Sequence, residues 1–264
     1  MFNLIQSQYA RGSAGEPLPT VFEALEEAGL KLIRGQLVLI AAGPGVGKSA
    51  FTLTLAMKSK VPTVYFSADS DSATQASRAL SIATGMPTAM SSEIVLEGLL
   101  DTYNEHLRQP IHFDYDASPS IDHIENVLEA YKQIYDHYPE LIVVDNITNV
   151  RKETDEDAPF EGLEALMDYL HTVARNTGAC VVGLHHVTGS FNDADKPVPL
   201  SGIKGQIGRV PEVVLTLHKS KLMGFDGDYD QLNVSIVKNR SGRAEPSGHN
   251  YVSLSFVGER MQIK

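Results

Sequence analysis

The sequence predicts an α/β fold, with a mostly parallel central sheet, helices on both faces and an antiparallel edge. Strand-like apolar runs alternate with segments of helical periodicity along most of the chain. These runs are continuous, as expected for parallel strands that are buried on both faces. The last two runs have no long helix between them, and we expect them to form the antiparallel edge. At 264 residues and 42% hydrophobic, the chain can bury one large core.

The order of elements follows from these patterns and from the positions of glycine and proline. Residues 1–29 are expected to form an N-terminal arm or linker with a short helix, and 30–264 the folded domain. The expected strands lie near Leu37–Ala42, Pro62–Ser67, Ile111–Phe113, Leu141–Asp145, Cys180–Leu184, Val213–Leu217 and Leu232–Val237. The expected helices lie at about Lys48–Ser59, Ala73–Thr84, Ile121–His137 and Phe160–Asn176.

Composition limits the class of protein. The single cysteine, Cys180, lies in the apolar run ACVVGL and is expected to be a buried strand residue, as suits a reducing cytoplasm. No signal peptide and no run of about 20 apolar residues is evident, so we expect a soluble, unprocessed, cytoplasmic protein with no membrane partner. The net charge of −11 argues against a surface built for nonspecific nucleic-acid binding, although a few cationic loops could still hold DNA.

The segment Leu37–Ser49, LVLIAAGPGVGKS, carries the strongest motif. An apolar strand leads into a glycine-rich turn that ends in Gly-Lys-Ser, which predicts a phosphate-binding loop for a nucleoside triphosphate. Lys48 would lie near the β- and γ-phosphates, and the Ser49 hydroxyl would bind Mg²⁺. Ala42 stands where the strict motif has glycine, so the match is to a relaxed form. The predicted nucleotide-binding residues are Gly43, Pro44, Gly45, Val46, Gly47, Lys48, Ser49 and Ala50.

Carboxylates follow two other predicted strands. Asp145 ends the apolar run LIVVD, and we expect it to hold Mg²⁺ beside Ser49; the alternative is an ordinary strand end. Asp69, in YFSADSD, is the candidate catalytic group that orients and deprotonates water. The alternative is that Asp69 or Ser70 caps the following helix, and both roles can hold at once.

Two histidines end the run VVGLHH. A polar side chain at this strand end can sense the γ-phosphate, and His186 is the candidate. The alternatives are a structural pair or a metal site that includes Asp193, but zinc needs three or four convergent ligands and no second cluster has a convincing spacing.

The whole order of motifs resembles the RecA-like core of the DnaB family of replicative hexameric helicases, and more loosely RadA and RecA. LIAAGPGVGKSAFTLTLA is similar to that family's phosphate loop and helix, and YFSAD to its FSLE segment. PIHFDYDASPSIDHIENVL resembles the strand and helix before Walker B, LIVVDNI the Walker B strand, GLHHVTG the sensor strand, and SIVKNRSGRAEP the KQRNG segment. The resemblance spans roughly Leu30 to Pro246.

This resemblance implies a RecA-like P-loop NTPase core at 30–264 that uses ATP and Mg²⁺ and acts as an ATP-dependent DNA helicase or translocase in replication. Lys48, Asp145 and His186 would have the roles given above. Lys238 and Arg240 would reach across a subunit boundary, so hydrolysis would depend on a homo-oligomer, a hexamer in this family. Without the resemblance, Lys238-Asn239-Arg240 would be interpreted as a solvated basic hairpin tip.

The family's DNA-binding pore loops correspond to the stretch before and within Gly189–Arg209. Its cations, Lys196, Lys204 and Arg209, lie among glycines and would suit single-stranded DNA without sequence preference. The acidic segment RKETDEDAPF is expected to be a solvated outer loop.

Two departures from the family pattern matter. Asp69 stands where the family has a catalytic glutamate, so turnover could be slow unless the backbone compensates or Asp71 takes over the role. The stretch before Leu30 is too short for the N-terminal collar domain of DnaB proteins, which leaves a stable ring and a primase or loader partner open. The alternative functions are a RecA- or RadA-like DNA-dependent ATPase that acts in recombination or loading without unwinding, and a regulatory nucleotide-binding module.

Overall fold

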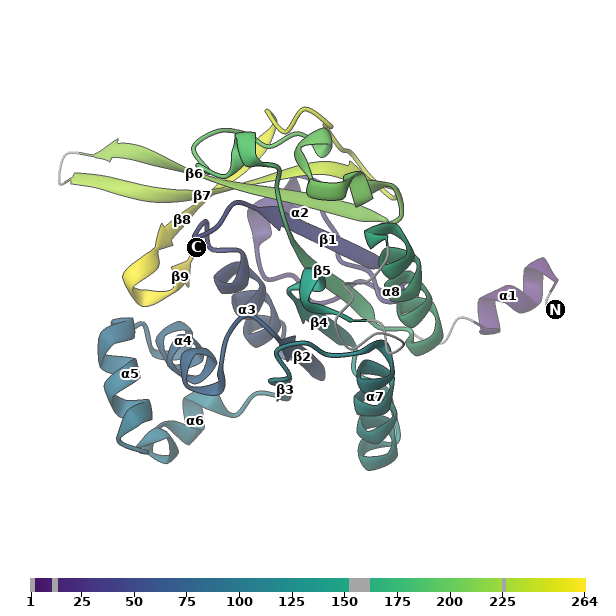
Figure 1. Cartoon of the computed structure of the whole chain (residues 1–264), viewed down its shortest axis with the longest axis horizontal. Coiled ribbons are helices and arrows are strands. Elements are labelled where there is room, and N and C mark those ends of the chain that lie inside the picture. The colour runs from purple at the N-terminus through teal and green to yellow at the C-terminus, as the bar shows by residue number, and fades with distance from the viewer. Residues whose placement is uncertain (1–2, 11–13, 152–161, 225–226) are drawn as a thin grey trace.

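The computed structural model describes residues 3–10, 14–151, 162–224 and 227–264. Within them the chain forms a nine-stranded sheet in the order β3-β2-β4-β5-β1-β6-β7-β8-β9 (Figure 1). The six strands β3, β2, β4, β5, β1 and β6 pair in parallel. Strands β7, β8 and β9 follow β6, and each pairs antiparallel with the strand before it. The predicted fold class is therefore confirmed. The strands are β1 Leu37–Ala42, β2 Thr63–Ser67, β3 Ile111–Asp114, β4 Leu141–Asp145, β5 Cys180–His186, β6 Val213–Gly224, β7 Gly227–Asn239, β8 Tyr251–Val257 and β9 Gln262–Ile263.

Helices cover both faces of this sheet. Alternate residues of β1 point to opposite faces, so Val38 and Ile40 pack in the same cluster as Phe51 of α3, and Leu37 and Leu39 in the cluster of α7 and α8. The α-helices are α1 Leu4–Ala10, α2 Glu23–Glu27, α3 Lys48–Ser59, α4 Ser72–Thr84, α5 Thr88–Leu96, α6 Asn104–Leu107, α7 Ile121–Tyr135 and α8 Leu163–Thr177. Short 3₁₀ segments lie at Leu100–Tyr103, Ile147–Asn149, Gly189–Phe191, Leu200–Gly202, Lys204–Arg209 and Gly258–Arg260.

The described helix ends agree with the prediction to within one residue, except the end of α7. Helix α7 ends at Tyr135 rather than His137, because Asp136 adopts a left-handed conformation with φ 62° and caps the helix. The predicted start at Phe160 lies outside the described residues, as do residues 152–160 of the expected acidic loop, and the described part of α8 begins at Leu163.

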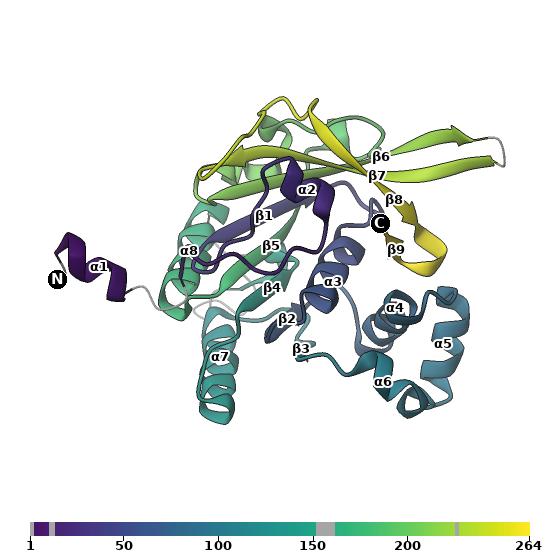
Figure 2. The same cartoon turned by 180° about the vertical axis from the view of Figure 1, so that it is seen from behind.

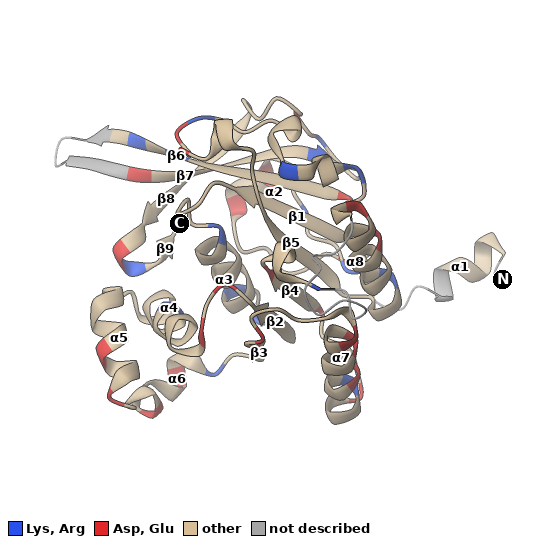
Figure 3. Cartoon of the chain, viewed as in Figure 1, with Lys and Arg blue, Asp and Glu red and all other residues tan. Residues whose placement is uncertain are grey.

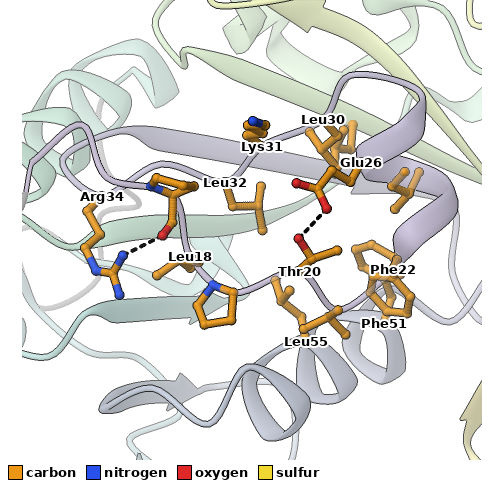
Figure 4. Close-up of a pocket in the computed structure, with 15 residues that line it drawn as sticks. Leu18, Thr20, Phe22, Glu26, Leu30, Lys31, Leu32, Arg34, Phe51 and Leu55 are labelled. Atoms are coloured by element: carbon orange, nitrogen blue, oxygen red, sulfur yellow. Dashed lines mark hydrogen bonds between the residues drawn. The ribbon is translucent and has the colours of Figure 1, made fainter.

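The N-terminal residues divide into two parts. Helix α1 stands away from the body of the molecule in both views (Figures 1 and 2). From Pro17 onward the chain packs on the domain: Leu18 and Phe22 are buried, and the Phe22 ring stacks on Phe51 of α3 with 4.7 Å between centroids. This packing differs from the linker expected for residues 17–29, because their apolar side chains close one face of the core. A pocket of about 330 Å³ remains between this segment and α3 (Figure 4).

The sheet also extends beyond the strands predicted from sequence. Strands β6 and β7 continue past the core as a long hairpin, and β8 and β9 add an edge that the apolar pattern did not indicate. Cys180 lies buried in β5 as expected, and burial raises the pKa of its thiol to about 12. No helix in the described part of the chain is long and apolar enough to span a bilayer.

Candidate active site

The glycine-rich turn between β1 and α3 has the backbone of a phosphate-binding loop. Gly45 and Gly47 have φ of 70° and 113°, in the left-handed region that favours glycine. A Cβ on Gly43 would lie 2.7 Å from the carbonyl oxygen of Asn192, so a side chain does not fit there. The turn brings its amides to the N-terminus of α3, where the helix dipole favours an anion.

Lys48 lies at the first position of α3 and is buried. Its Nζ donates a hydrogen bond to the backbone oxygen of His185, at 3.1 Å, so the ammonium is held at the end of β5. Burial lowers the pKa of Lys48, whereas the negative charges of Asp145 and Asp69 oppose that shift. A phosphate group bound at the glycine-rich turn would act in the same direction as these carboxylates and keep Lys48 charged.

Asp145 ends β4 with its side chain buried beside Ser49 and Tyr65. The Tyr65 hydroxyl donates to Oδ2 at 3.0 Å, but the buried Oδ1 has no hydrogen-bond partner among the described residues. Burial raises the pKa of Asp145, and the nearby hydroxyls of Ser49 and Tyr65 and the charge of Lys48 oppose this shift. A buried carboxylate oxygen without a partner, next to a serine hydroxyl, fits the ligand set of Mg²⁺.

Asp69 lies just beyond β2, on the same side of the sheet. Its backbone N–H and that of Ala68 donate to the backbone oxygen of Asp145, at 3.2 and 2.7 Å, and tie the two strand ends together. The helix-capping alternative for Asp69 or Ser70 is wrong: Asp71 caps α4 and accepts a hydrogen bond from the Thr74 N–H. These hydrogen bonds lower the pKa of Asp71 and engage its carboxylate at the helix start. Asp69 is therefore the better candidate for the water-activating group.

A cavity of about 500 Å³ lies over the phosphate-binding loop. It brings together Asp69, His186 and all eight predicted nucleotide-binding residues, Gly43 to Ala50. It also contains five residues that sequence reasoning missed, because they come from α4, β6, β8 and the turn between β8 and β9: Arg78, Lys219, Phe256, Gly258 and Met261. The Lys219 ammonium lies 5.3 Å from the centre of the Phe256 ring, so this wall offers an aromatic face and a cation.

The two histidines at the end of β5 contact different partners. His186 Nε2 lies 2.5 Å from Asn146 Nδ2 and its ring lines the cavity, whereas His185 Nε2 lies 2.8 Å from the backbone oxygen of Lys204. Burial lowers the pKa of both, that of His185 to about 4. The alternative of a metal site with Asp193 is not formed, since no group of three or more potential ligands occurs among the described residues.

Comparison with known proteins identifies the family. The model of the DnaB-like helicase C-terminal domain matches residues 17–264. The chain belongs to this family. It is a DnaB-type replicative helicase core.

One of two similar proteins carries the DnaB name. The chain is 59% identical over 266 residues to the Gene 65 protein of Mycobacterium phage L5, a name that states no activity, covering all of this chain and 98% of that protein. It is 22% identical over 254 residues to the replicative DNA helicase DnaB of Leifsonia xyli subsp. xyli, covering 91% of this chain and about half, 54%, of that protein.

Solved structures share the fold of this DnaB-like core. A DnaB-like replicative helicase, described with its interactions with primase, has a TM-score of 0.77 at 17% identity, and the match covers 98% of this chain and 64% of that one. A solved ATPase domain has a TM-score of 0.75 at 18% identity, and that match covers 98% of this chain and 96% of the other. The sheet and helices described above are therefore those of a RecA-like helicase ATPase domain.

The two basic residues of the family's KQRNG-like segment lie outside the cavity. Lys238 of β7 pairs with Val214 of β6, and the neighbouring Val213 pairs with Val38 near the start of β1. The basic pair therefore lies toward the end of β1 that is opposite the phosphate-binding loop. Lys238 Nζ donates to the backbone oxygens of Gly208 and Arg209, and burial lowers its pKa to about 8. The interpretation as a solvated hairpin tip is wrong for Lys238, because its ammonium is engaged by these carbonyls.

The predicted DNA-contacting cations of this DnaB-like core lie on a loop that is joined to the sensor strand. Val187 bridges to Ile203, and the Thr188 N–H donates to the Gly202 oxygen at 2.8 Å. Lys204 is exposed. Lys196 Nζ lies 5.2 Å from the centre of the Phe191 ring, and Arg209 forms an ion pair with Glu164.

Proposed function

We propose that this DnaB-type core is an ATP-driven DNA helicase or translocase that hydrolyses ATP at interfaces between copies of the chain and moves on single-stranded DNA. One observation carries the proposal. Lys48, Asp145 and Asp69 converge at one end of β1, whereas Lys238 and Arg240 lie toward the other end. A second copy is needed to bring the two sets of groups together, and we propose a ring of six.

The predicted site residues in and beside the cavity have roles that fit their surroundings. Ser49 and Asp145 would hold Mg²⁺, which neutralises phosphate charge when bound. The loop amides and Lys48 would orient the phosphates, and Asp69 would hold the attacking water and accept its proton at the carboxylate. His186, whose burial lowers its pKa and so favours the neutral ring, would detect the γ-phosphate.

The position of the charges supports contact with DNA at the 189–209 loop. Acidic residues on α5, α6 and α7 lie on the side of the molecule away from this loop (Figure 3), whereas Asp193 and Asp195 lie within it. Part of the overall charge of −11 therefore lies away from the three cations of the loop, of which Lys204 is exposed and Arg209 pairs with Glu164. The loop is joined to the residues that directly follow His186 at the end of β5. The position of the bound DNA and the nucleotide state of the site would therefore be coupled.

The test is steady-state ATP hydrolysis at several protein concentrations, with and without single-stranded DNA, followed by unwinding of a forked duplex. Lys48→Ala should abolish hydrolysis and serves as the control for contaminating enzymes. Stimulation by DNA, a more than linear dependence on protein concentration, and unwinding are expected. DNA-stimulated hydrolysis without unwinding would instead favour an assembly or loading factor, and hydrolysis that ignores DNA would favour a regulatory nucleotide-binding module.

A further inference from the structure

Glu212 is a buried carboxylate that no step above uses. It precedes β6, and its side chain is 6% exposed. Its Oε2 accepts a hydrogen bond from the N–H of Leu37 at 3.0 Å, and its Oε1 lies 3.3 Å from Arg240 Nη1 and 3.0 Å from His171 Nε2. One acidic side chain thus contacts the first residue of β1, a residue of α8 and the proposed trans-acting arginine.

The backbone around Glu212 fixes the carboxylate in place. Its N–H donates to the oxygen of Leu37 at 2.9 Å, and its own oxygen accepts from the N–H of Arg240 at 3.0 Å. A buried carboxylate is costly without charged or polar partners, so the structure favours keeping the Arg240 guanidinium against it. The Arg240 side chain is nevertheless 49% exposed, which leaves part of the guanidinium free to meet another molecule.

Lys238 and Arg240 both donate hydrogen bonds to the backbone of residues 208–210. Arg240 Nη2 donates to the backbone oxygens of Arg209 and Val210, at 3.3 and 3.2 Å, and Lys238 Nζ donates to those of Gly208 and Arg209. These carbonyls lie at the end of the 189–209 loop. Among the described contacts of the Arg240 guanidinium, Glu212 is the negatively charged side chain, and the backbone carbonyls are the other hydrogen-bond acceptors.

We infer that Glu212 is a positioning residue, which holds Arg240 in the orientation that an arginine acting across a subunit boundary requires. The inference rests on the proposed function, in which Arg240 serves the ATP site of a neighbouring copy. Glu212 does not touch the nucleotide of either copy and acts through Arg240. Replacing it should leave ATP binding intact and slow the chemical step in the neighbour.

The expected loss of kcat follows from the rate that is lost when a catalytic arginine is misplaced. An arginine supplied by a neighbour raises the rate about 10³- to 10⁵-fold, and a displacement of 1 Å can cost about 10²-fold. Glu212→Gln keeps an acceptor for the Leu37 N–H but turns an N–H₂ group toward Arg240. We expect kcat to fall about 10- to 100-fold, with KM for ATP changed less than about twofold. Glu212→Asp keeps the charge and shortens the side chain by one methylene, and its kcat should lie between those of wild type and Glu212→Gln.

The decisive experiment mixes variants. Glu212→Gln and Lys48→Ala chains are combined, and ATP hydrolysis is measured in the mixture and in each chain alone. A Lys48→Ala chain hydrolyses no ATP but carries an intact Glu212 and Arg240, which it can offer to a neighbour. Recovery of hydrolysis in the mixture is the expected result. The matched control is Glu164→Gln, an exposed carboxylate in the nearby ion pair with Arg209, which should leave hydrolysis by the unmixed chain within about twofold.

A parallel mixture of Arg240→Ala with Lys48→Ala tests the trans-acting role of Arg240 separately from the positioning role of Glu212. Recovery there without recovery for Glu212→Gln would overturn the role of Glu212 and leave the trans-acting arginine standing. No recovery in either mixture would overturn both. If Glu212→Gln fails to fold, as judged by circular dichroism and ATP binding, Glu212→Asp is mixed in its place and read by the same criteria.

Discussion

Removing the hydroxyl of Tyr65 should destabilise the protein by an amount that depends on pH. Tyr65 is fully buried, and its hydroxyl donates to Asp145 Oδ2 at 3.0 Å. Tyr65→Phe removes this donor and leaves the ring in place, so the change acts mainly on the carboxylate. A hydrogen bond to a charged group is worth about 1.5–3 kcal/mol, and one between neutral groups about 0.5–1.5 kcal/mol.

The pH dependence follows from the titration of Asp145. Burial raises its pKa above the ordinary value of 3.8, so the folded chain binds more protons than the unfolded chain between these two pKa values. The contribution of this group to stability therefore decreases as pH rises through that window. The Tyr65 hydroxyl lowers the pKa of Asp145 in the folded chain. Tyr65→Phe therefore raises that pKa further and widens the pH range between the unfolded and folded pKa values. The loss in free energy of unfolding should be about 1.5–3 kcal/mol above the folded pKa, and smaller below it, where Asp145 is neutral.

The assay is urea unfolding without nucleotide, at a series of pH values from neutral to mildly acidic, on wild type and Tyr65→Phe. Tyr131→Phe is the matched control, because Tyr131 is buried on α7 and does not contact Asp145. Its effect should be small and independent of pH over this range. An equal loss for Tyr65→Phe at every pH would refute the role assigned to the hydrogen bond with the charged carboxylate.

Substitutions at two further positions test the site and the N-terminal packing. Asp69→Asn should block turnover while preserving ATP binding, and Asp69→Glu should raise kcat if the shorter side chain limits the reaction; wild-type turnover in Asp69→Asn would remove Asp69 from the mechanism. Phe22→Ala should lower the free energy of unfolding by about 3–5 kcal/mol, because the ring is buried and stacks on Phe51. A loss below about 1 kcal/mol in thermal or urea unfolding would mean that residues 17–29 contribute little to the domain.

The sequence by itself determined the central strands and the phosphate-binding loop, because their signals are local. A continuous apolar run, followed closely by glycines and Lys-Ser, encodes β1, the turn and the start of α3, whose bounds Lys48–Ser59 agree with the prediction. Strand β4 ends at Asp145 as expected for the same reason. Fully buried parallel strands are easy to recognise, since both faces must be apolar.

The tertiary structure decided which distant residues complete the cavity. Phe256 lies on β8, next to the last strand of the sheet, where exposed and less exposed residues alternate, and this short pattern carries no signal that the strand adjoins the phosphate-binding loop. Lys238 and Arg240 were predicted by motif order, but the contact of Arg240 with Glu212 and the hydrogen bonds of both residues to the 208–210 carbonyls depend on the pairing of β6 with β7. Local sequence specifies backbone conformation and burial, whereas contacts between strands far apart in the chain depend on sheet order and register, which no single segment encodes.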